Sequence, residues 1–142
     1  MLSRLIYVST AVGPVTTAVT GTILRSAQAH NPANGITGVL CQGRGLYLQV
    51  LEGEHSQVDA LYARIALDKR HHHVKLRQQE SISRRRYGKW AMAHVDMGQL
   101  SAQEAAHPQQ TAFDPYTATA EQVMAKIDAL IAAGKVMNAP VI

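Results

Sequence analysis

The spacing of apolar residues predicts five strands and two helices within residues 1–98. Runs rich in β-branched and aromatic residues, bounded by turn signals, predict strands over 4–11, 36–42, 46–53, 74–82 and 90–97. Apolar residues recur at helical spacing after Pro14 and after Ser56, which predicts helices that end near residues 30 and 66. Ser56 and Asp59 have the spacing of a capping box.

The order of these elements predicts an α+β fold of the ferredoxin-like type, βαββαββ, because its first six elements form a split βαβ arrangement. The first and third strands are neighbours in that arrangement, so Tyr7 and Gln49 are expected on adjacent central strands. We therefore expect one domain over residues 1–98 and a C-terminal helical extension over residues 99–142.

The C-terminal extension begins with a connector that prolines interrupt and continues with a helix predicted near 119–133. Thr119 and Gln122 provide a capping box at its start, and Gly134 a stop signal at its end. The apolar stripe of this helix needs a partner surface. We expect it to pack on the sheet face that the first two helices leave bare.

Three polar side chains stand where the pattern predicts core: Tyr7 and Gln49 in mid-strand, and Asn31 at the end of the first helix. A buried amide without a partner costs about 1–3 kcal/mol, so Gln49 needs one. Each residue alone has an ordinary structural explanation. Together, with Ile23 and Ile65 as the walls of a slot between the helices, they predict a site for a flat heteroaromatic ligand.

Composition adds limits on function. Hydrophobic residues make up 46% of the chain and charged residues 17%, which is typical of a soluble globular protein, and no apolar run is long enough to cross a membrane. The single cysteine, Cys41, excludes an internal disulfide and suits a reducing compartment, so a cytoplasmic location is expected.

Charge and histidine clustering do not predict a further site. The net charge is +4, with a basic run at 83–89, but such a run is usually a solvated face, so nucleic-acid binding is not expected. Consecutive histidines at 71–73 would point to both faces of a strand, so no metal site is predicted.

Several separated motifs, in order and at compatible spacing, resemble the BLUF family of flavin-based blue-light sensors. The resemblance covers residues 3–97 and rests on four segments: LIYVS (5–9), QAHNPANGITGVLCQGRGLYLQVLEG (28–53), LYARIALDKRHHHV (61–74) and RRYGKWAMAHV (85–95). Tyr47 stands where phenylalanine is frequent in the family, and Ala91 stands where serine is frequent.

The resemblance implies a flavin held non-covalently between the two helices, with FAD favoured and FMN or riboflavin as alternatives. It assigns to Tyr7 the donation of an electron to the photoexcited flavin, and to Gln49 a hydrogen-bonded bridge from this tyrosine to the flavin edge. It further assigns ring binding to Asn31, Ile23 and Ile65, contacts near the ribityl and phosphate part to Asp68, Arg70 and His71, and signal relay to Trp90 and Met92, which are expected to share one face of the last strand.

The sequence is therefore interpreted as a photoreceptor without a catalytic output domain of its own. Its signal is expected to pass through the C-terminal segment, through a homo-oligomer, most simply a dimer, and to an unidentified partner protein. One alternative is a ferredoxin-like hydrolase of the acylphosphatase type, with Arg4 or residues 84–86 holding phosphate. Another is a ferredoxin-like nucleic-acid-binding domain, which needs exposed aromatic residues on the sheet.

Overall fold

The computed structural model describes residues 1–14, 16–98 and 113–139 and contains one six-stranded sheet in the order β4-β1-β3-β2-β5-β6. Its elements are β1 (Leu2–Ala11), α1 (Thr17–His30), the short 3₁₀ helix η1 (Pro32–Asn34), β2 (Thr37–Gly43), β3 (Leu46–Glu54), α2 (His55–Ala66), β4 (His71–Ser81), β5 (Ala93–Gly98), α4 (Ala120–Ala132) and β6 (Val136–Asn138). None of the helices within these residues is both long and apolar enough to span a membrane.

Strand pairing confirms the ferredoxin-like arrangement expected from the element order. β1 lies between β3 and β4 and is antiparallel to both, and β2 is antiparallel to β3. β5 pairs with β2 in parallel, and β6 pairs with β5 in antiparallel. β6 was not predicted, because its three residues are too few to show an alternating pattern.

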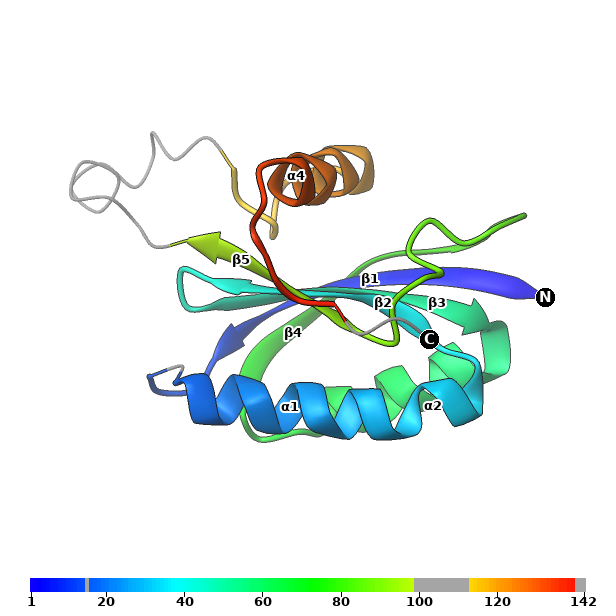
Figure 1. Ribbon diagram of the computed structural model, residues 1–142, viewed down its shortest axis with the longest axis horizontal. Coiled ribbons are helices and arrows are strands. Elements are labelled where there is room, and N and C mark those ends of the chain that lie inside the picture. Colours follow the sequence, from blue (N-terminus) through cyan, green and yellow to red (C-terminus); the bar gives the residue numbers. More distant parts are fainter. Residues whose placement is uncertain (15, 99–112, 140–142) are drawn as a thin grey trace.

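The helices form separate layers on the two faces of the sheet, with α1 and α2 on one face and α4 on the other (Figure 1). One apolar cluster lies beneath α1 and α2 and includes Leu5, Leu40 and Leu51. The second joins the opposite face to α4, where Val123 and Ile127 are fully buried. The expected packing of the C-terminal helix on the bare sheet face is therefore confirmed.

The capping box predicted at the start of α2 is wrong, whereas the one predicted for α4 is correct. α2 begins at His55, and its N-cap residue, Glu54, makes no capping hydrogen bond through its side chain. The Asp59 carboxylate binds Gln79 and His55 instead of closing a capping box. In α4, the Thr119 side chain accepts a hydrogen bond from the Gln122 backbone, and the Gln122 side chain accepts one from the Thr119 backbone.

We expect Thr119→Ala to lower the free energy of unfolding by about 1 kcal/mol, because the first turn of α4 loses its side-chain acceptor. Urea denaturation followed by circular dichroism measures this change. Thr117→Ala is the matched control, since Thr117 is exposed and lies outside the capping box. Equal effects of the two substitutions would show that the cap does not stabilise α4.

Candidate functional site

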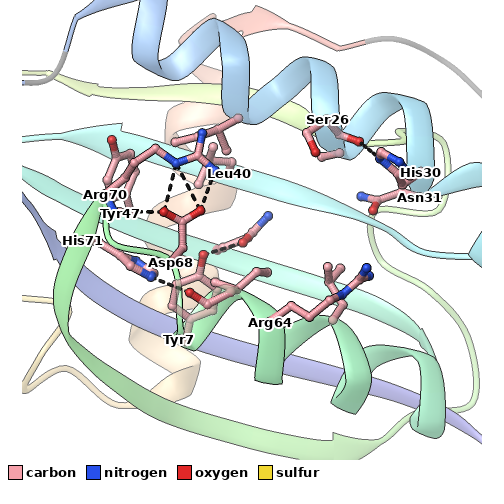
Figure 2. A pocket seen from close by; sticks show the side chains of 15 residues that line it. Tyr7, Ser26, His30, Asn31, Leu40, Tyr47, Arg64, Asp68, Arg70 and His71 are labelled. Atoms are coloured by element: carbon pink, nitrogen blue, oxygen red, sulfur yellow. Dashed lines mark hydrogen bonds and ion pairs between the residues drawn. The ribbon is translucent and has the colours of Figure 1, made fainter.

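A cavity of about 250 Å³ lies between α1, α2 and the central strands. The close view shows Tyr7 and Asn31 at separate places along it, with Asp68, Arg70 and His71 grouped near Tyr47 (Figure 2). The predicted site residues among its lining are Tyr7, Ile23, Asn31, Gln49, Ile65, Asp68, Arg70 and His71. The slot expected from the sequence thus exists, and these side chains meet in it.

The register of β1 and β3 places Tyr7 directly opposite Gln49. The Tyr7 hydroxyl donates a hydrogen bond to Gln49 Oε1 at 2.5 Å, and Gln49 Nε2 donates to the Met92 sulfur at 3.3 Å. Tyr7 and Gln49 are both buried. The acceptor end of the amide therefore faces the phenol, and its donor end faces the thioether.

The electrostatic surroundings keep the Tyr7 phenol protonated in its resting state. Burial is the largest cause of a raised Tyr7 pKa, and the neighbouring Tyr62, Asp68 and Tyr47 raise this pKa further. Loss of the Tyr7 proton at neutral pH therefore requires a change in the phenol itself, such as oxidation.

Asn31 is held at the end of α1, where its backbone N–H donates to Ala27 O. Its side chain is buried, and Nδ2 donates to the Ala91 carbonyl at 3.0 Å. Oδ1 makes no hydrogen bond to the residues that the structure describes. The arrangement leaves this oxygen able to accept a hydrogen bond from a ligand N–H in the cavity.

Asp68 and Arg70 form a compact ion pair beside Tyr47. The Arg70 guanidinium and backbone N–H both donate to the Asp68 carboxylate, at distances of 2.5–3.1 Å. Hydrogen bonds from Arg70 are the largest cause of a lowered Asp68 pKa, and the same pair raises the Arg70 pKa. Asp68 therefore remains a carboxylate at neutral pH.

His71 lines the cavity, but protein groups engage both of its ring nitrogens. Nδ1 lies 2.6 Å from the Ser9 hydroxyl, and Nε2 lies 2.7 Å from the Ile65 carbonyl. Because a carbonyl only accepts, Nε2 carries the proton. The ring contacts Tyr7 and Tyr47 edge-on, at centroid distances of 6.2 and 6.3 Å. His71 thus fixes the positions of these tyrosines and has no nitrogen left for a ligand.

Trp90 and Met92 do not share one face of a strand, which corrects the sequence prediction. β5 begins only at Ala93, so both residues precede it. Met92 is fully buried in the cluster beneath α1 and α2. Trp90 packs against the opposite cluster and stacks on Tyr87 at 6.3 Å. The irregular backbone at Trp90–Met92 breaks the alternation on which the prediction relied.

Glu52 is a structural residue that the sequence analysis missed. It is fully buried, pairs with Arg4 at 2.8 Å, and accepts backbone hydrogen bonds from Arg86 and Tyr87. Arg4 also pairs with Glu80. Because these carboxylates already engage Arg4, Arg4 is poorly placed to hold the phosphate that the hydrolase alternative requires it to bind.

Within the described residues, no three histidine, cysteine, aspartate or glutamate side chains gather into a metal site.

The sequence pattern of the BLUF family, described as "Sensors of blue-light using FAD", matches residues 2–93. The chain belongs to the BLUF family. This membership removes the support for the acylphosphatase alternative, because the matched residues are those of a light sensor.

Curated relatives are much longer than this chain. The photoactivated adenylate cyclase subunit alpha of Euglena gracilis is 39% identical over 87 residues, which are 61% of this chain and 8% of that protein. An alpha-like protein of the same organism is 42% identical over 73 residues, 51% of this chain and 7% of that protein. The chain thus spans less than a tenth of the length of these two relatives.

Solved BLUF structures match nearly the whole chain. BlrB, described as a BLUF protein in its dark state, has a TM-score of 0.73 and 27% identity, covering 94% of this chain and 96% of its own. The photo-activated state of BlsA has a TM-score of 0.75 and 27% identity, and the match covers 92% of this chain and 95% of the BlsA chain. The likeness to these two proteins therefore extends beyond the family-matched residues 2–93 into the C-terminal part of the chain.

Proposed function

We propose that this chain is a blue-light photoreceptor in which Tyr7 and Gln49 perform the switching chemistry beside a non-covalently bound flavin. The observation that carries the proposal is the buried series of hydrogen bonds from the Tyr7 hydroxyl through the Gln49 amide to the Met92 sulfur. A flavin bound in the cavity supplies an oxidant when it absorbs blue light.

Oxidation of Tyr7 makes its phenol a strong acid, and its hydroxyl already points at Gln49 Oε1. A proton can therefore leave along this hydrogen bond. Rotation or tautomerisation of the amide then exchanges the donor and acceptor ends of Gln49. After return of the electron and proton, the exchanged arrangement persists as a different hydrogen-bond network.

The exchange has a direct consequence for Met92. A thioether sulfur is a weak acceptor and has no proton to donate. Rotation of the amide places its oxygen beside the sulfur in place of Nε2, and the hydrogen bond between Gln49 and Met92 is then lost. Met92 is thus the first residue other than Tyr7 and Gln49 whose hydrogen bonding changes. This agrees with the relay role proposed for it.

For the ligand, we favour FAD over FMN and riboflavin, in line with the family description. Arg64, Arg70 and His30 border the cavity beside the ring-binding residues and could attract the phosphates of FAD or FMN. Flavin released from the purified protein by heat and separated by chromatography identifies the form. FMN or riboflavin in place of FAD would contradict this part of the proposal.

Asn31→Ala should weaken FAD binding by about 1–3 kcal/mol, because it removes the oxygen offered to the ligand and leaves the Ala91 carbonyl without its donor. Isothermal titration of the apoprotein with FAD measures the change. Asn34→Ala is the matched control, since Asn34 lies nearby but binds only the exposed His30 carbonyl. An unchanged dissociation constant in Asn31→Ala would contradict the role assigned to Asn31.

The proposed output route leads from Met92 to α4. Trp90, two residues before Met92, stacks on Tyr87, and the Tyr87 hydroxyl donates to Asp128 of α4 at 2.9 Å. Arg86 also pairs with Asp128. A shift at Met92 therefore has a packed route to the opposite sheet face, where an unidentified partner protein would detect it.

A homodimer and a cytoplasmic location remain proposals. The apolar face of α4 is covered by the sheet of its own chain, so this face is not free to bind a second copy. Light scattering in darkness and under blue light tests the dimer, and a monomer under both conditions would contradict it.

Absorption spectra of the purified protein with FAD, taken in darkness and directly after blue illumination, test the proposed function. We expect an oxidised-flavin spectrum that shifts reversibly to the red. A static flavin spectrum would mean that the chain binds flavin without switching, and failure to bind FAD would contradict the site.

A further inference from the structure

Tyr7 contacts a second tyrosine that the proposed photochemistry does not use. The rings of Tyr7 and Tyr62 lie 5.6 Å apart between centroids and are tilted by 43°. This distance is within the range of about 4.5–7 Å for aromatic rings in contact. Tyr62 comes from α2 and is not among the residues that line the cavity. Tyr7 therefore borders the cavity and also contacts Tyr62.

The surroundings of the two hydroxyl groups differ. The Tyr7 hydroxyl is buried and donates to an amide oxygen, which is a weak base. Tyr62 is only partly buried, and its hydroxyl has no hydrogen-bond partner among the described residues. The Tyr62 hydroxyl is not a buried atom, so it reaches solvent. An oxidised phenol sheds its proton, and only Tyr62 can deliver that proton directly to water.

We propose that Tyr62 is a second electron donor, which re-reduces oxidised Tyr7 and opens a side route out of the photocycle. This inference rests on the proposed function, because the oxidant is the photoexcited flavin. One electron passes from the Tyr62 ring to oxidised Tyr7, which returns to a neutral phenol and keeps its proton. The Tyr62 O–H bond breaks, its proton goes to water, and a neutral tyrosyl radical remains on Tyr62. The electron that Tyr7 first gave up stays with the bound flavin.

Other aromatic residues are less well placed for this role. Trp90, the only tryptophan in the sequence, packs on the opposite side of the sheet against Tyr87. Tyr47 lines the cavity, but its ring contact is with His71. Among the described residues, Tyr62 is the one tyrosine whose ring contacts that of Tyr7.

Electron paramagnetic resonance on the full chain reconstituted with FAD tests this inference. Samples are frozen under continuous blue light without oxygen, and ring-deuterated tyrosine identifies a tyrosyl signal by its narrowing. The variants are Tyr62→Phe, Tyr7→Phe and Tyr47→Phe, with Tyr116→Phe as a control outside the cavity. FAD content, circular dichroism and the reversible red shift are recorded on each sample.

We expect a tyrosyl signal in the wild type, in Tyr47→Phe and in Tyr116→Phe, and its loss in Tyr62→Phe and in Tyr7→Phe. Tyr62→Phe should also form the red-shifted state with a higher yield per absorbed photon, because the side route is closed. A signal that persists in Tyr62→Phe, or a red-shifting wild type without a tyrosyl signal, would overturn the inference. A signal in Tyr7→Phe would show that the electron does not pass through Tyr7. Absence of the wild-type red shift would overturn the proposed function instead.

Discussion

Gln49→Leu is expected to abolish the light-induced red shift while the protein still binds FAD. Leucine fills a similar space in the cavity wall but has neither a donor nor an acceptor, so it cannot exchange hydrogen bonds between Tyr7 and Met92. Light-minus-dark absorption spectra of the FAD-loaded variant measure the effect. The expected result is an oxidised-flavin spectrum whose bands do not shift under blue light.

The matched control for this substitution is Gln42→Leu. Gln42 lies on the neighbouring strand β2, is partly exposed, and is not part of the cavity lining. We expect its red shift to equal that of the wild type. A full reversible red shift in Gln49→Leu would contradict the proposed switch, whatever the control shows.

Glu52→Ala is expected to lower the free energy of unfolding by about 3–5 kcal/mol, the usual cost of removing one partner from a buried ion pair. The substitution leaves Arg4, whose side chain is only 14% exposed, with the partly exposed Glu80 as its remaining ion-pair partner, and leaves the backbone N–H groups of Arg86 and Tyr87 without their acceptor. Urea denaturation measures the loss. The segment that carries Tyr87 and leads to Trp90 should loosen as well.

Glu54→Ala provides the matched control for Glu52→Ala. Glu54 is two residues further along β3, with a side chain that is 61% exposed and pairs with the N-terminal amine. Exposed pairs of this kind contribute about 0–1 kcal/mol. A loss in Glu52→Ala no larger than that in Glu54→Ala would show that Glu52 does not anchor the loop before β5.

The pairing of Tyr7 with Gln49 could be predicted from the sequence because it depends on two regular features. Strand alternation sets the face on which each side chain lies, and the split βαβ order makes their strands neighbours. The structure adds the register, in which the two residues lie directly opposite each other. Asn31 could be placed near the cavity for a similar reason, since a proline fixes the end of α1 next to it.

The separation of Trp90 from Met92 could not be predicted from periodicity. Alternation applies only within a regular strand, and the chain becomes regular only at Ala93. The buried role of Glu52 was also out of reach, because its partners are a distant arginine and two backbone groups in a loop. No local pattern in the sequence marks such partners. The expected boundary between a domain over 1–98 and an extension over 99–142 stays a prediction, and most of the connector lies outside the described residues.

Tyr62 illustrates a different limit. Its helical spacing in α2 correctly indicates a side chain that faces the core. That spacing cannot reveal that the ring reaches Tyr7, because the distance depends on how closely α2 packs on β1. The contact became visible only when both elements were placed in space.

Light-minus-dark infrared spectroscopy of protein labelled with isotopes in the glutamine side chains tests the exchange at Gln49 most directly. Only a glutamine whose hydrogen bonds change contributes label-sensitive bands to the difference spectrum. We expect such bands in the FAD-loaded wild type and their disappearance in Gln49→Leu. A wild type that shifts to the red without any glutamine-sensitive band would contradict the exchange.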